Sequence, residues 1–180
     1  MRELRNKGFS LLELLLVMML LGIVAVAAIP DLSSGTPERL ELAAEEIAGA
    51  MRFARSEALR SGEPHGFHLQ TTEARIRVMS ADTSSTPWAP DYDVGHPGVH
   101  DFYDIDLAHH PYSGIDGLAR NATFRDNCNN HDLVYFDASG MPWCGDSNGP
   151  MLEQYDVTLS FGDQSRVVSL HGLTGRVTVQ

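Results

Sequence analysis

The sequence has 180 residues, with 13 Lys and Arg against 24 Asp and Glu, and its formal net charge at pH 7 is −11. This acidic balance disfavours a nucleic-acid-binding role, because attraction to phosphate supplies most sequence-independent affinity for DNA and RNA. The length after residue 30 suffices for one domain with its own core.

A short basic leader precedes a long apolar segment. Residues 1–8 carry a net charge of +2, and residues 9–29 contain a single charged side chain, that of Glu13. As an α-helix the apolar segment would measure about 31 Å, enough to cross a hydrocarbon core of about 30 Å. The leader predicts a cytoplasmic N-terminus, with everything after Pro30 on the far side of the membrane.

The charged side chain of Glu13, inside an apolar segment long enough to cross a membrane, requires an explanation. A carboxylate inside a spanning helix costs roughly 3 kcal/mol near the centre and less toward the ends, so it tends to mark function. A secretory signal peptide, with Ala25-Val26-Ala27 as its cleavage site, is one alternative, and a plain membrane anchor is another. Neither explains Glu13, and the apolar segment is longer than that of a usual signal peptide.

Residues 1–30 resemble the N-terminus of type IV pilins and type II secretion pseudopilins. The resemblance implies that prepilin peptidase cuts after Gly8 and that the new first residue, Phe9, is N-methylated. It also implies that Glu13 pairs with the terminal amine of an adjacent subunit and sets the axial register of assembly. Pro30 would bend the helix after the span. Removal of residues 1–8 would take the net charge from −11 to −13, because these residues carry +2.

A second helix is predicted after Pro30. Thr36 is suited to an N-cap and Pro37 to the first helical position, and Ser61-Gly62-Glu63-Pro64 would end the helix. Apolar residues recur at helical spacing between these signals. They are Leu40, Ala43, Ala44, Ile47, Met51, Ala54 and Ala58. This face is rich in small residues, so we expect a β-sheet to pack closely against it.

Beyond Pro64 the apolar pattern changes to a period near two, which indicates antiparallel strands. The predicted strands are 66–69, 74–79, 133–136, 156–161, 166–170 and 177–179. The intervening segment, residues 81–130, is interrupted by prolines and glycines and shows no clear period. It is expected to be a functional irregular insertion or to contain short strands.

The exported part resembles the GspH/FimT branch of minor pseudopilins. Three stretches carry this resemblance: residues 54–62, 134–142 and 175–177. It implies an α+β pilin-like fold, with a long N-terminal helix packed on an antiparallel sheet, in a periplasmic domain spanning residues 30–180. It further implies a minor pseudopilin near the tip of a type II secretion pseudopilus, anchored in the bacterial inner membrane and assembled with other pseudopilins.

The alternative within this branch is a FimT/FimU-like minor pilin of a type IV pilus, acting in pilus assembly, twitching or DNA uptake. DNA binding in such proteins depends, by the same resemblance, on basic residues near the C-terminus. Here the last 15 residues contain only two arginines, Arg166 and Arg176. The sequence therefore favours the secretion pseudopilin and no nucleic-acid partner.

Two cysteines, Cys128 and Cys144, lie in the part expected to be exported. An oxidising compartment favours a disulfide between them, with two free thiols as the alternative. A metal site would usually need two further ligands at short spacing, and there is no C-x-x-C motif.

Histidines and acidic residues gather in the irregular segment. A zinc site there, or a membrane-tethered metal hydrolase, is the competing enzyme hypothesis, but no H-E-x-x-H or comparable spacing occurs. Residues 126–132 offer calcium-type oxygen ligands without the glycine and distal glutamate of an EF-hand loop. We expect no enzyme, no metal and no cofactor. The histidines and acids concerned are His96, His100, His109, His110, His131, Asp101, Asp104 and Asp106.

Overall fold

The computed structural model describes residues 11–28, 36–98, 100–109, 111–128, 131–145 and 149–180. The chain divides into two compact units, Met1–Gly35 and Thr36–Gln180, and each is described by itself. Of the residues singled out from the sequence, Gly8, Phe9, Pro30 and His110 lie outside the described part.

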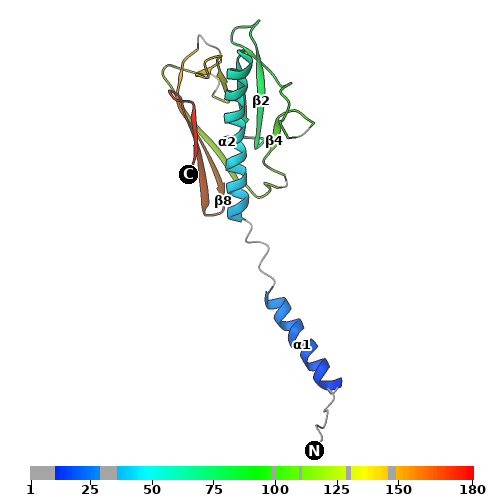
Figure 1. The fold of residues 1–180 in the computed structure, drawn as a ribbon. Coiled ribbons are helices and arrows are strands. Elements are labelled where there is room, and N and C mark those ends of the chain that lie inside the picture. Colours follow the sequence, from blue (N-terminus) through cyan, green and yellow to red (C-terminus); the bar gives the residue numbers. More distant parts are fainter. Residues whose placement is uncertain (1–10, 29–35, 99, 110, 129–130, 146–148) are drawn as a thin grey trace, which may run out of the picture. The chain divides into compact units, whose positions relative to one another are not determined.

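The first unit contributes one helix, α1 (Leu11–Ala28), with Glu13 in its first turn (Figure 1). It coincides with most of the apolar helix predicted over residues 9–29. In the portion of the chain that the structure describes, no helix combines the length and apolar character needed to span a membrane. The membrane-spanning role of residues 9–29 is therefore a prediction.

The second unit is built on α2 (Thr36–Ser61), whose start and end agree with the predicted helix. The residues on its small apolar face, from Leu40 through Ala58, are fully buried. The helix ends where the backbone N–H of Gly62, at φ +74°, donates to the carbonyl of Ala58 at 3.0 Å. Glycine is favoured there because its positive φ costs side-chain-bearing residues energy.

Strands of the second unit form two antiparallel sheets rather than one. The six-stranded sheet has the order β3-β2-β1-β6-β7, with β4 also paired to β2. The four-stranded sheet has the order β10-β9-β8-β5. The first contains β1 (His65–Gln70), β2 (Arg75–Asp82), β3 (Ala89–Asp91), β4 (Asp104–Asp106), β6 (Leu133–Phe136) and β7 (Pro142–Cys144). The second contains β5 (Gly117–Phe124), β8 (Leu152–Phe161), β9 (Gln164–His171) and β10 (Arg176–Val179).

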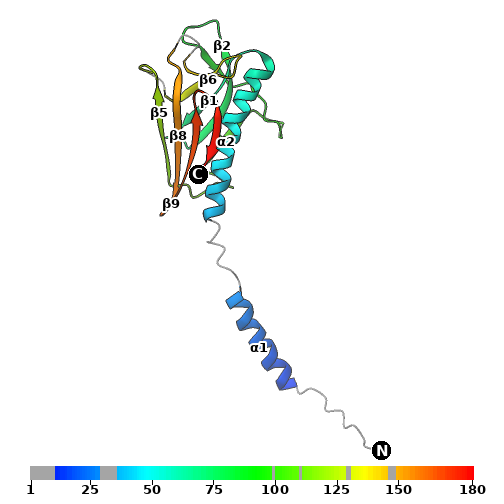
Figure 2. The same ribbon diagram turned by 60° about the vertical axis from the view of Figure 1, so that its left-hand side comes forward.

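Helix α2 contacts both sheets, and Figures 1 and 2 show it lying lengthwise against them. The core is continuous from this helix into both sheets. Phe67 of β1 meets the ring of Tyr155 of β8 edge-on at 5.4 Å between centroids, and the ring of Phe136 at 6.2 Å. The α+β class predicted from the sequence is confirmed. The small face of α2 explains how one helix approaches two sheets closely.

Residues 81–130 are less irregular than their composition suggested, because β3, β4 and β5 lie within them. The longest, β5, pairs with β8 along its whole length. None of its residues is fully buried, and its sequence GLARNATF mixes apolar residues with the polar Arg120, Asn121 and Thr123. An edge strand of this kind lacks the strong alternation that marks a half-buried strand. The short strand β7 and the first four residues of β8 were missed as well.

Candidate assembly and interaction site

Glu13 is the one charged residue of α1, and it is exposed together with its apolar neighbours. Ten consecutive side chains of this helix, Leu11 to Leu20, are exposed in the isolated chain. The large apolar ones are 44% to 82% exposed. An apolar surface of this extent is not stable in water and requires lipid or protein to cover it. The carboxylate, at the positive end of the helix dipole, is presented within that surface.

The disulfide expected from the sequence is present between Cys128 and Cys144, with their Cα atoms 6.0 Å apart. Both cysteines are buried. The bond joins the segment after β5, in one sheet, to β7, in the other. Trp143 lies beside it, and its Nε1 donates to the carboxylate of Asp137 at 2.8 Å.

The described histidines of the irregular segment are dispersed rather than gathered. His109 Nδ1 lies 2.9 Å from Asp106, His131 packs edge-on against Phe124, and His100 lies on an exposed turn. Across the described residues there is no group of three or more histidine, cysteine or acidic side chains able to hold a metal ion. The calcium-type segment 126–132 contains residues 129 and 130, which lie outside the described part.

His96 has a structural role in this segment. Its ring packs on Tyr103 at 4.5 Å between centroids, and Tyr103 stacks in turn on Phe53 of α2 at 5.1 Å. His96 Nε2 also lies 3.9 Å from the carboxylate of Glu46. The backbone N–H of Tyr103 donates to the carbonyl of Val94 at 2.8 Å. These contacts hold the loop, described over residues 93–98 and 100–103, against α2.

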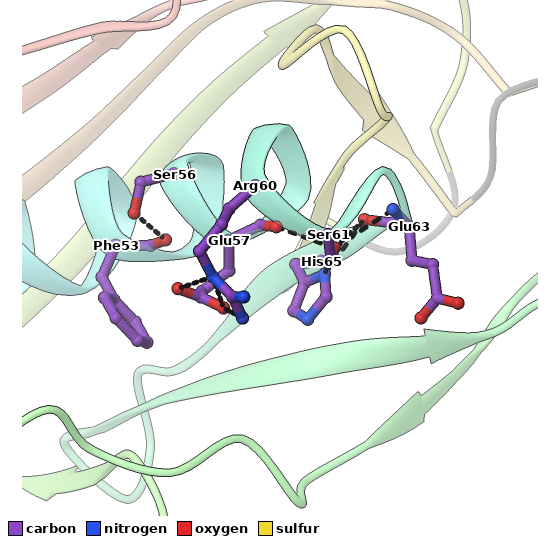
Figure 3. Close-up of polar contacts among 7 residues, drawn as sticks. All are labelled: Phe53, Ser56, Glu57, Arg60, Ser61, Glu63 and His65. Atoms are coloured by element: carbon purple, nitrogen blue, oxygen red, sulfur yellow. Dashed lines mark hydrogen bonds and ion pairs between the residues drawn. The ribbon is translucent and has the colours of Figure 1, made fainter.

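That loop forms one wall of a groove of about 540 Å³ at the C-terminal end of α2. The opposite wall is α2 itself, through Phe53, Glu57 and Arg60. Figure 3 shows these side chains extending from the same side of the helix end, with His65 beside them. Val94 and Pro97 add apolar surface from the loop. The volume falls within the range of about 300–1,000 Å³ that is typical of ligand sites.

Polar contacts fix the groove at its helical end (Figure 3). Arg60 Nε donates to Glu57 at 3.1 Å, and this hydrogen bond is the main reason that the pKa of Glu57 lies below its usual value. Ser61 Oγ donates to the carbonyl of Glu57 at 2.8 Å and accepts from the N–H of Glu63 at 3.1 Å. His65 is only 8% exposed. Its Nδ1 lies 3.0 Å from the carbonyl oxygen of Glu63.

Sequence reasoning did not find this groove. The Glu57–Arg60 pair at a spacing of three was detectable as a helical ion pair. The approach of this pair to Asp93, Val94 and the other loop residues was not detectable, because that loop belongs to the segment whose apolar residues show no clear period.

Comparisons with known proteins find relatives of this chain in sequence and in fold. A family model for the prokaryotic N-terminal methylation motif matches residues 4–29, and one for type II transport protein GspH matches residues 43–174. The type II secretion system protein H of Xanthomonas campestris pv. campestris is 37% identical over 89 residues. That alignment covers 49% of this chain and 52% of the relative, so the chain spans about half the length of the relative it matches.

Among solved structures, the minor pseudopilin EpsH from the type 2 secretion system of Vibrio cholerae superposes with a TM-score of 0.50 at 11% identity. The superposition covers 79% of this chain and 96% of EpsH. The type IV minor pilin FimU of Pseudomonas aeruginosa gives a TM-score of 0.48 at 16% identity, covering 81% of this chain and 91% of FimU. At such identity the EpsH likeness establishes the fold alone.

Proposed function

Because the chain belongs to the GspH family of type II transport proteins, we propose that it is a minor pseudopilin of a type II secretion system. In this role it is a structural subunit near the tip of a periplasmic pseudopilus and has no catalytic activity. The match of the GspH family model over residues 43–174 carries the proposal, and the N-terminal methylation motif over residues 4–29 supports it.

Processing and membrane insertion form the first part of the proposal. Prepilin peptidase removes residues 1–8 after Gly8, and Phe9 becomes the N-methylated first residue. Residues 9–29 then anchor the subunit in the inner membrane, with the domain at 30–180 in the periplasm. The buried Cys128–Cys144 disulfide is in keeping with that oxidising compartment.

Assembly is the second part, and Glu13 directs it. The exposed apolar surface of α1 packs against the helices of neighbouring subunits, and the carboxylate is then removed from water. A desolvated carboxylate must find a charged or hydrogen-bonding partner. The new amine of Phe9 on an adjacent subunit supplies one, so that pairing selects a single axial register.

Mass spectrometry of the protein purified from its native membrane tests the processing step. We expect an N-terminal peptide that begins at Phe9 and carries one added methyl group. A mature protein that begins at Ala28, or an unprocessed Met1, would show that residues 1–30 are a signal peptide or a plain anchor.

A secretion assay tests whether the subunit belongs to a type II secretion system or to a type IV pilus. The gene should restore secretion to a strain that lacks its own H subunit, and the full-length protein should not shift DNA on a gel. Salt-sensitive DNA binding without restored secretion would instead favour the type IV pilus subunit. The acidic charge of −11 argues against that outcome.

A further inference from the structure

We propose that the groove at the C-terminal end of α2 binds an arginine side chain presented by a partner protein. The inference goes beyond the assembly role of Glu13 and does not depend on it. It rests on the hydrogen-bonding character of the groove, its charge and its apolar wall.

His65 defines the hydrogen-bonding character. Its Nδ1 faces the carbonyl oxygen of Glu63 at 3.0 Å, and a carbonyl oxygen can only accept. The proton of the neutral ring therefore sits on Nδ1, and Nε2 is left as an acceptor. His65 lines the groove, and Nε2 has no hydrogen-bond partner among the described residues. Figure 3 shows this edge of the ring turned away from the helix end.

Carboxylates supply the charge. Arg60, the one arginine of the groove, is already engaged with Glu57. Asp93 accepts a hydrogen bond from the neutral hydroxyl of Ser80 at 3.0 Å. Within the described part of the chain, the carboxylate of Glu63 has no ion-pair or hydrogen-bond partner. The groove thus offers two uncompensated carboxylates and one imidazole acceptor, with no free cation to match them.

The apolar wall favours a cation that is carried at the end of a long side chain. Phe53, Val94 and Pro97 can cover the methylene groups of a long side chain, while its charged end reaches the acceptors. A guanidinium carries five N–H donors in one plane, and it also stacks on aromatic rings. It can therefore donate hydrogen bonds to several separated acceptors at once, whereas a lysine ammonium is a compact point charge. Arginine is therefore the side chain that fits best.

Titration of the full-length protein in detergent micelles tests the proposal. The probe is the peptide acetyl-Gly-Gly-Arg-Gly-Gly-amide, and its binding is followed by NMR of the His65 ring, assigned with a His65→Gln variant. The comparison peptides carry citrulline, which has the arginine shape without the charge, or lysine. We expect a saturable shift with the arginine peptide, at least tenfold weaker binding of the citrulline peptide and weaker binding of the lysine peptide.

Variants locate the binding site. Glu63→Gln and Asp93→Asn should each weaken the arginine peptide at least fivefold, and Glu153→Gln, at an exposed position on β8, should leave it unchanged. Glu63→Gln removes no contact between described side chains, so it separates binding from folding. The proposal is overturned if no saturable shift occurs, if citrulline or lysine binds as well as arginine, or if Glu63→Gln behaves like Glu153→Gln. Because no filament is involved, these results are independent of the pseudopilus assignment.

Discussion

Removing the disulfide tests how the two sheets are held together. Cys128 and Cys144 are 16 positions apart, so the bond closes a loop of 17 residues. On the chain-entropy relation, such a loop restricts the unfolded chain enough to stabilise the fold by about 3 kcal/mol. The variant Cys128→Ala/Cys144→Ala should therefore lose about that much free energy of unfolding. Alanine is preferred to serine because both sites are buried and a hydroxyl there would lack a partner.

Urea unfolding of the full-length protein in micelles measures this loss. Trp143 lies next to the bond and Trp88 packs edge-on against Tyr135 of the same sheet, so tryptophan fluorescence reports on the region concerned. With a slope of about 2 kcal/mol per molar urea, the midpoint should fall by about 1.5 M. The wild-type protein in reductant should match the double variant, and reductant should not affect the variant. If the midpoint is unchanged in the double variant and in the reduced wild-type protein, the disulfide does not stabilise the fold.

Two further predictions concern packing and pH. A Cβ on Gly66 would lie 2.3 Å from the carbonyl oxygen of Val134 on β6, so Gly66→Ala should destabilise the protein by about 2 kcal/mol or more. As a control, a Cβ on Gly95 would meet nothing within 4 Å, so Gly95→Ala should be close to neutral. Thermal or urea unfolding measures both variants. Burial raises the pKa of Tyr155 well above its usual value, and its hydroxyl has no partner among the described residues. The pKa of Tyr155 is raised in the folded state but not in the unfolded state, and this difference contributes to stability. The contribution is present below about pH 10 and is lost as the pH rises further. Tyr155→Phe should therefore change the free energy of unfolding by less than about 1 kcal/mol at pH 7. Above pH 10 the free energy of unfolding should fall less steeply in the variant than in the wild-type protein. An equally steep fall in both proteins would count against a raised pKa of Tyr155.

The sequence predicted those elements whose pattern is strong. Helix α2 has an apolar stripe, a proline near its start and a glycine after its end, and its limits followed from these signals. Most of β8 and β9 was also recognised, from the period of two in residues 156–161 and 166–170.

Other features depended on contacts between distant parts of the chain. The edge strand β5 is defined by its pairing with β8, because its own residues mix polar and apolar types and none is fully buried. The groove brings Phe53 of the helix to Asp93 and Val94 of a loop without periodicity. Tyr103 packs between Phe53 and His96 and holds that loop in place. Only the fold reveals this contact.

Glu13 is the residue on which the proposed assembly rests, and one substitution separates assembly from insertion and processing. Glu13→Ala leaves the apolar surface of α1 intact, so the variant should still enter the membrane and be cut before Phe9. The decisive measurement is the amount of subunit in purified pseudopili, relative to the amount in the membrane. We expect Glu13→Ala and Glu13→Gln to be processed yet absent from the filament, while Glu73→Ala, at an exposed turn of the domain, is incorporated normally. Incorporation of processed Glu13→Ala at the wild-type level would contradict the proposed role of Glu13 in assembly.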